Sequence, residues 1–213
     1  MSLGLIGTYT GAYHGSAAGL EDDSSALKFQ PVIPFRAFGA NNILRISLPY
    51  NFDGRGQEGL GDVSIFDLVT IDASWGRWAV GPLVTLASDS AAPDPVVAGP
   101  AIGGIYQASK TLNLGLFNQS VFGGDTSISQ IQPIVAYQLG EGLAISGGDL
   151  QFVYDWRDSR WLSLPIGFQI GKVASLWNQP IRVALNPQYN FADDDGLAEW
   201  QVTLSVTLLA PSR

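Results

Sequence analysis

The stretch Trp200-Gln201-Val202-Thr203-Leu204-Ser205-Val206-Thr207-Leu208 alternates apolar and polar residues without a break, and the same two-residue period recurs through most of the chain. Because successive side chains of a β-strand point to opposite faces, this alternation predicts strands with one apolar and one polar face. The direction in which the apolar face points then decides between a barrel in water and a barrel in lipid.

The composition favours a single β domain over residues 1–213. The chain has 25 Gly and 12 Pro, and only 14% of its residues are charged. A water-soluble domain carries about 25% charged residues, so this chain has few charges with which to hydrate a whole surface. No segment approaches the roughly 20 consecutive apolar residues that a membrane helix requires. Apolar residues dispersed in short alternating runs instead predict a transmembrane β-barrel.

Turn signals divide the chain into about twelve alternating runs. A strand tilted by about 45° needs roughly 9–11 residues to cross a bilayer, whereas soluble strands usually have about 5–6 residues. The length of the runs therefore favours an all-β, closed, antiparallel up-and-down transmembrane β-barrel of about 12 strands. The runs lie near residues 3–14, 25–36, 41–53, 60–73, 76–88, 96–109, 111–122, 127–139, 142–156, 160–172, 180–191 and 198–209.

The connections between successive runs alternate in length and charge. One set is mostly tight and nearly uncharged, at residues 37–40, 74–75, 109–110, 140–141 and 175–179. The other set holds fourteen of the nineteen acidic residues. Outer-membrane barrels have short periplasmic turns and longer external loops, so the acidic rim is expected on the outside. The alternative is that acidic residues simply favour loops.

The polar face of the runs is typical of a lumen wall, because it carries amides, hydroxyls and glycine where a soluble exterior would carry more Lys and Glu. By simple alternation, Asp67 would lie on the same face as the apolar residues Val63 and Ile65. A carboxylate in lipid is costly, so we expect its side chain in the lumen. Alternation places Lys172 on the apolar face of its run, so we expect its long side chain to reach the polar rim of the membrane. The predicted pore-lining residues are Lys28, Gln30, Arg36, Arg45, Asp67, Arg77, Gln169, Arg182 and Gln188.

These lumen residues leave conduction and selectivity open. Basic side chains in a pore favour anions, whereas the acidic rim repels them at the entrance. Ion pairs that block conduction are as compatible with the sequence as a permeation path.

Two local features refine the barrel. The apolar parity changes between Ile145 and Leu150, and Gly147-Gly148 lies between them, so a β-bulge is predicted there. Aromatic residues near the run ends indicate girdles at the membrane interface, although simple alternation places Trp161 inside.

Several segments resemble the outer-membrane family named for the MetA pathway of phenol degradation. The similarity covers most of residues 27–209, and the chain departs from the usual outer-membrane pattern at Leu209-Ala210-Pro211-Ser212-Arg213, where an aromatic residue is common. The resemblance implies an outer-membrane barrel, and the family's name suggests the uptake of hydrophobic compounds. The segments are Phe29-Gln30-Pro31-Val32-Ile33-Pro34, Gly59-Leu60-Gly61-Asp62, Leu164-Pro165-Ile166-Gly167-Phe168-Gln169-Ile170-Gly171-Lys172-Val173, Gln179-Pro180-Ile181, Asn186-Pro187-Gln188-Tyr189-Asn190 and Trp200 to Leu208.

The sequence gives little support for catalysis, a metal or a cofactor. It contains no Cys, and His14 is its only histidine, so a Ser-His-Asp arrangement would rest on that residue alone. Asp193-Asp194-Asp195-Gly196 lacks the alternating ligand spacing of a calcium loop and is interpreted as a charged turn. A net charge of −8 and scattered basic residues argue against nucleic acid as a partner. We expect a protein that is not an enzyme.

Two classes of function remain. The first is a passive channel or transporter of the bacterial outer membrane for small solutes, including hydrophobic ones, with the lipid bilayer and the solute as its partners. The second is a barrel with a closed lumen that binds a ligand or is structural, an engineered barrel included. The N-terminus lacks a signal peptide, so an exported form would be a mature chain with an added Met. The oligomeric state, and whether residues 1–20 form a strand or a plug, stay open.

Overall fold

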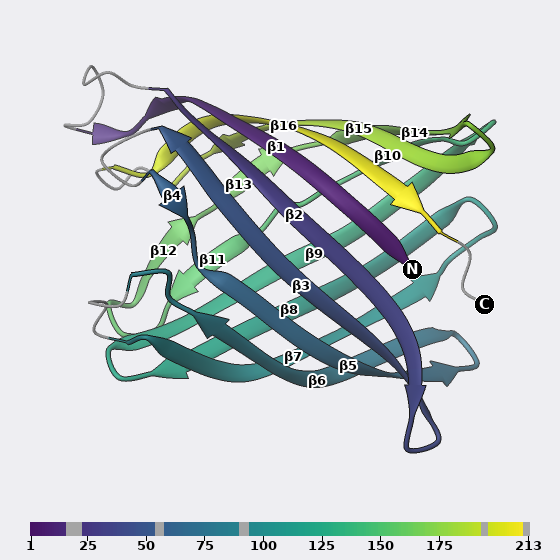
Figure 1. Ribbon diagram of the computed structural model, residues 1–213, viewed down its shortest axis with the longest axis horizontal. Coiled ribbons are helices and arrows are strands. Elements are labelled where there is room, and N and C mark those ends of the chain that lie inside the picture. Colours follow the sequence, from purple (N-terminus) through teal and green to yellow (C-terminus); the bar gives the residue numbers. More distant parts are fainter. Residues whose placement is uncertain (16–22, 54–57, 90–93, 193–195, 211–213) are drawn as a thin grey trace.

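The protein is a closed antiparallel β-barrel with twelve wall strands, as predicted (Figure 1). The computed structural model describes residues 1–15, 23–53, 58–89, 94–192 and 196–210. Ten wall strands are formed by single elements: β1 Ser2–Tyr13, β2 Ser24–Ala37, β3 Ala40–Asp53, β5 Val63–Ala73, β6 Gly76–Leu86, β7 Val96–Gln107, β8 Leu112–Gly123, β9 Thr126–Gly140, β15 Gln179–Asn190 and β16 Ala198–Leu209.

Two wall strands are interrupted, and one short element lies beside the wall. The ninth wall strand consists of β10 (Leu143–Ser146) and β11 (Phe152–Asp155), which both pair with β9. The tenth consists of β12 (Arg160–Ser163), β13 (Pro165–Gly167) and β14 (Gln169–Leu176). The two-residue β4 (Gly59–Leu60) pairs with β3. The continuous runs that alternation predicted over 142–156 and 160–172 are therefore broken in the structure.

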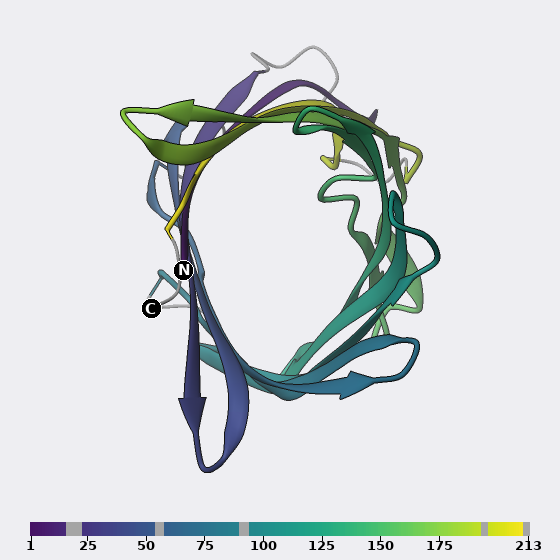
Figure 2. The same ribbon diagram turned by 90° about the vertical axis from the view of Figure 1, so that its right-hand side faces the viewer.

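The first and last strands close the ring, which Figure 2 shows from one end. β1 pairs with β2 on one side and with β16 on the other, where Ser2 lies opposite Leu209. The terminal amine of Met1 donates to the carbonyl of Ala210 at 3.1 Å, and the Ala210 N–H donates to the Met1 carbonyl at 2.9 Å. Residues 2–13 are thus a wall strand and not a plug.

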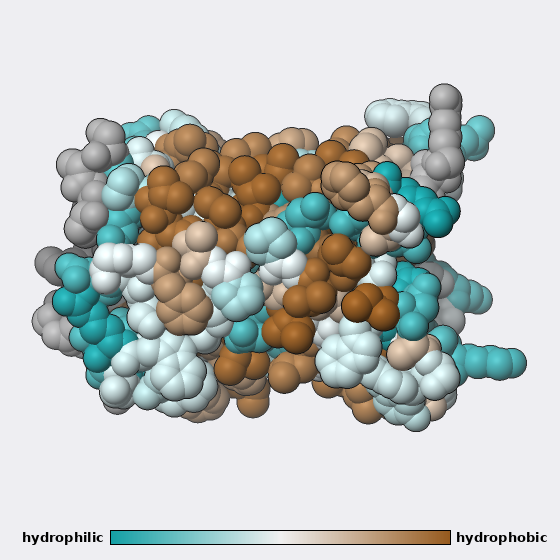
Figure 3. Space-filling view, turned by 90° about the horizontal axis from the view of Figure 1, so that it is seen from below, coloured by the Kyte–Doolittle hydropathy of each residue, from teal (hydrophilic) through white to brown (hydrophobic). Residues whose placement is uncertain are grey.

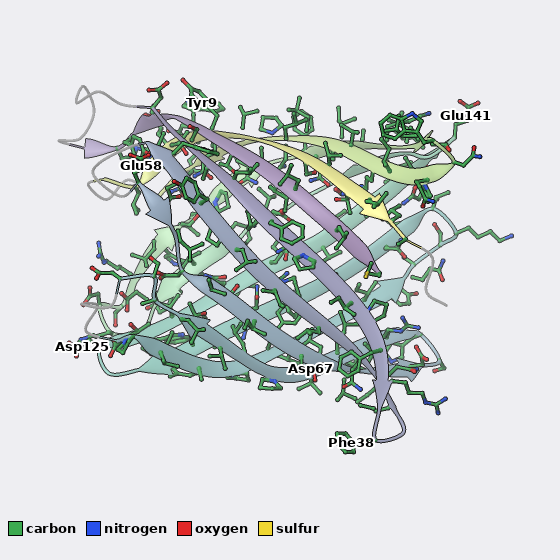
Figure 4. The ribbon with its side chains drawn as sticks, in the orientation of Figure 1. Tyr9, Phe38, Glu58, Asp67, Asp125 and Glu141 are labelled. Carbon is green, nitrogen blue, oxygen red and sulfur yellow. The ribbon has the colours of Figure 1, made fainter. Side chains whose placement is uncertain are left out.

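The two kinds of connection lie at opposite ends of the barrel. Figure 4 shows Glu58 and Asp125 at one end, which we call the acidic rim, and Phe38 and Glu141 at the other, which we call the tight-turn rim. At the acidic rim, Arg157 forms an ion pair with Asp125, and this pairing raises the pKa of the Arg157 guanidinium. For the described residues, the two predicted kinds of connection therefore lie at opposite ends, while Glu21, Asp22 and residues 193–195 lie outside the described residues.

The outer wall is apolar along the middle of the barrel. Leu116, Leu185 and Leu204 lie on three different strands and are 53%, 49% and 52% exposed. Figure 3 shows such side chains gathered between more polar ends on one face of the molecule. Apolar side chains that point away from the barrel axis are typical of a barrel in a bilayer and not of a barrel in water. The barrel therefore presents a lipid-facing surface.

Among the described residues, no helix has the length and apolar character needed to cross a bilayer.

Aromatic clusters mark both ends of this apolar belt, as interfacial girdles do. Near the acidic rim, the Tyr154 ring centroid lies 4.8 Å from Trp156 and 5.0 Å from Trp161. Near the tight-turn rim, the rings of Trp75 and Trp78 lie 5.0 Å apart. Trp161 pairs with the outward Tyr154, so the inward position predicted for Trp161 is wrong. The register shift between β11 and β12 changes the simple alternation at this point.

Asp67 faces outward, which corrects the expectation that it faces the lumen. It lies opposite Leu44 on β3 and shares the face of Val69, whereas its neighbour Phe66 points inward beneath Arg45. The pairing of β5 with β6 keeps one register from Val63 to Ala73, so no bulge turns Asp67 inward. The Asp67 Oδ1 atom is buried and has no hydrogen-bond partner among the described residues. The pleat of the strand therefore outweighs the cost of an outward carboxylate.

Replacing this outward carboxylate should stabilise the barrel. We expect Asp67→Val to raise the free energy of unfolding by about 1–2 kcal/mol, because a charged side chain on a lipid-facing wall destabilises a barrel and an acidic one does so less than a basic one. Urea unfolding in lipid vesicles measures this change. The matched variant Val69→Asp, on the same face of the same strand, should lower stability. A less stable Asp67→Val protein would show that the carboxylate has a favourable partner.

Candidate functional site

The inner face of the barrel is divided into an apolar and a polar half. On β5 to β7, Phe66, Leu68, Leu83 and Ala101 are between 0% and 6% exposed and pack together inside the barrel. Phe117 of β8 packs against this cluster, with its ring centroid 5.7 Å from that of Phe66. On this side, apolar side chains fill the interior where the alternation predicted a polar lumen wall.

Arg45 of β3 lies at the border between the two halves. Its Nη2 donates to Oε1 of Gln119 on β8 at 2.7 Å, and its guanidinium lies 4.0 Å from the ring centroid of Phe66. The contact with Gln119 joins strands that are not neighbours in the wall. A hydrogen bond together with a cation–π contact fixes this charge over the apolar half.

The polar half encloses two cavities that meet inside the barrel. The inner cavity, toward the tight-turn rim, has a volume of about 370 Å³, and the outer cavity, toward the acidic rim, has a volume of about 170 Å³. Gln30, Gln132 and Asp149 line both cavities, so they form the joint between them. The inner cavity is also lined by Ser2, Ile6, Val32, Ile134, Ser146, Gln169, Arg182, Ser205 and Thr207, and the outer one by Lys28, Arg45, Ser47, Asp62, Ser64, Gln119, Gln130 and Gln151.

Asp149 reaches the joint because the chain leaves the wall between β10 and β11. Residues 147–151 lie opposite residues 132–135 of β9, so this side has five residues against four. The one extra residue explains the change of parity, and the predicted bulge at Gly147-Gly148 is confirmed in a larger form. We call residues 147–151 the inward loop, and Figure 2 shows it projecting from the wall toward the axis.

Hydrogen bonds hold the inward loop in place. The Gly147 N–H donates to the Val135 carbonyl at 2.9 Å, and Gln132 Nε2 donates to the Gly148 carbonyl at 3.1 Å. Leu150 is 8% exposed and anchors the other end of the loop. The exposed Asp149 is consequently presented to the lumen by a tethered segment.

Charges of both signs face each other across the two cavities. The carboxylate of Asp149 interacts electrostatically with Lys28 and Arg45. Among the described residues that line the two cavities, the cations are Lys28, Arg45 and Arg182 and the carboxylates are Asp149 and Asp62. The lining therefore has a small excess of positive charge.

Five of the predicted lumen residues lie around these cavities. Lys28 and Arg45 line the outer cavity, Gln169 and Arg182 line the inner one, and Gln30 lines both. Gln30 Nε2 donates to Ser47 Oγ at 2.9 Å, and Arg182 Nη2 donates to Gln169 Oε1. All five lie on the inner face of the barrel, and their role in permeation stays a prediction.

Three other predicted residues lie away from the joint. Arg36 is exposed beside the β2–β3 turn. Arg77 forms an exposed 2.6 Å ion pair with Asp72 at the tight-turn rim. Gln188 lines a separate cavity of about 230 Å³ near the acidic rim, together with Glu199.

Sequence reasoning missed Asp149, although the signal was present. This acid directly follows the Gly147-Gly148 pair at which the parity breaks. A bulge re-aims the side chains beside it, so a charged residue at that position was a candidate for the lumen.

The remaining chemical candidates lie elsewhere. His14 Nε2 is 2.8 Å from the backbone oxygen of Asn190, and the ring packs edge-on against Tyr189 with a centroid distance of 6.2 Å. This contact ties the end of β1 to β15. The charged turn at residues 193–195 lies outside the described residues.

The fold is similar to those of outer-membrane proteins with known structures. The NanC porin has a TM-score of 0.65 at 13% identity, covering 98% of this chain and 100% of that chain. The KdgM porin has a TM-score of 0.62 at 10% identity, covering 99% and 100%. Outer-membrane phospholipase A from Escherichia coli has a TM-score of 0.53 at 12% identity, covering 100% and 97%. At these identities the likeness shows the fold alone.

No family model and no curated protein matches the sequence. The resemblance to the family named for the MetA pathway is therefore not confirmed.

The inward loop should depend on glycine at one position only. Gly148 has a φ of +65°, and an added Cβ would lie 2.6 Å from Nδ2 of Asn186, which is 1% exposed. We expect Gly148→Ala to lower the free energy of unfolding by about 2 kcal/mol or more, because a left-handed conformation and a clash combine. An added Cβ at Gly147 meets its nearest atoms at 3.7 Å. Gly147→Ala should stay within about 0.5 kcal/mol of the unmodified protein. Equal unfolding midpoints for the two variants in urea would contradict this placement of the loop.

Proposed function

We propose that the protein is a passive channel of the bacterial outer membrane for small solutes, with no catalytic activity of its own. The observation that carries the proposal is the pair of adjoining polar cavities, one toward each rim, inside a barrel with an apolar exterior. The porin-like fold supports the same proposal.

The lining favours small hydrophilic solutes and, among ions, anions. Amides and hydroxyls replace part of a solute's hydration shell, and Lys28, Arg45 and Arg182 supply positive potential along the cavities. The apolar half of the interior is packed with its own side chains and leaves the polar half as the path.

Uptake of hydrophobic or amphiphilic solutes is a second candidate. Ile6, Val32 and Ile134 line the inner cavity beside Arg182, which offers an apolar surface next to a cation. A solute with an apolar body and a carboxylate would use both. A closed lumen that binds such a solute without conducting it is the alternative to a channel, and Arg45, held across the interior by Gln119, supports it.

Conductance in a planar lipid bilayer tests the proposal. We expect stepwise currents from the folded protein and, in a KCl gradient, a reversal potential that shows a preference for chloride. Lys28→Gln should lower the chloride-to-potassium permeability ratio by about threefold, because one unit charge acts at short range in a water-like dielectric. Lys172→Gln is the matched control, since Lys172 is exposed on the outer face opposite Val183. A folded protein that stays electrically silent, as judged by heat-modifiable migration in a detergent gel, would overturn the proposal.

A further inference from the structure

The inward loop places one carboxylate at the joint between the two cavities. Asp149 lines both the inner and the outer cavity, whereas the other charged residues each line one of them. Any solute that passes from one cavity to the other within the polar half must pass this side chain.

We propose that Asp149 determines the ion selectivity of the channel by offsetting the cations that surround it; this inference rests on the proposed channel function. Lys28 of β2 and Arg45 of β3 line the outer cavity together with the carboxylate, and Arg182 lines the inner cavity with it. Without Asp149, Asp62 would be the remaining described carboxylate on the two cavities. The carboxylate therefore reduces an otherwise clear preference for anions to a weak one.

The geometry fits a fixed charge and not a mobile gate. The Gly147 N–H, the Gly148 carbonyl and the buried Leu150 hold the loop on both sides of Asp149. Asp149 itself is exposed in the lumen, so its charge acts directly on passing solutes.

The test is the reversal potential of Asp149→Asn in a KCl gradient across a planar bilayer. The substitution keeps the size of the side chain and removes its charge. We expect the chloride-to-potassium permeability ratio to rise by about threefold, and Asp149→Lys to raise it further. Glu141→Gln is the matched control, because it removes one negative charge at the tight-turn rim (Figure 4) and Glu141 lines neither cavity.

The outcomes separate this inference from the proposed function. If the unmodified protein conducts and Asp149→Asn conducts with an unchanged ratio, the inference is overturned and the channel stands. An equal rise in the ratio for Glu141→Gln would also overturn it, since net charge and not the joint would then set selectivity. If the folded unmodified protein is silent, the channel fails and the inference fails with it. Heat-modifiable migration in a detergent gel confirms that each variant has folded before its current is measured.

Discussion

Closure of the hydrogen-bonded ring is the constraint on which the rest of this structure depends. In hydrocarbon, an unpaired backbone N–H or C=O costs several kcal/mol, so a sheet crosses a bilayer only when it has no free edge. Here the pairing of β1 with β16 removes both edges, and Met1 and Ala210 extend that seam to the ends of the described chain. Every other strand can then keep one face in lipid and one in the lumen.

In this closed ring, the pleat of each strand directs successive side chains alternately to lipid and to the lumen, with few exceptions. Asp67 shows how strict it is, because an uninterrupted register keeps this carboxylate on the outer wall beside apolar neighbours. The inward loop, like the register shift between β11 and β12, shows how an extra residue changes which side chains face the lumen. One extra residue opposite β9 changes the parity from Ile145 to Phe152, and a glycine with positive φ permits the turn.

Alternation in the sequence therefore predicted the wall well and the interior less well. A period of two residues identifies strands, the lipid-facing side chains and residues such as Lys28 and Arg182, because each depends only on local geometry. The apolar half was not predictable in this way. On β5, apolar residues occupy both faces, as Ile65 and Phe66 illustrate, so the pattern does not say which of them fills the lumen. Nor does it reveal contacts such as Arg45 with Gln119, which depend on the curvature of the closed sheet.

The number of strands alone does not set the width of this lumen. Side chains fill a barrel of about eight strands, and twelve leave additional space. In this chain the cluster around Phe66 and Leu83 occupies part of that space, and burying each such side chain away from lumen water stabilises the barrel by roughly 1.5–3 kcal/mol. The packed half and the inward loop leave cavities of about 370 and 170 Å³ beside fixed charges. The packed side chains and the charged cavities thus occupy opposite halves of one interior, and Arg45 contacts Phe66 in one half and lines the outer cavity in the other.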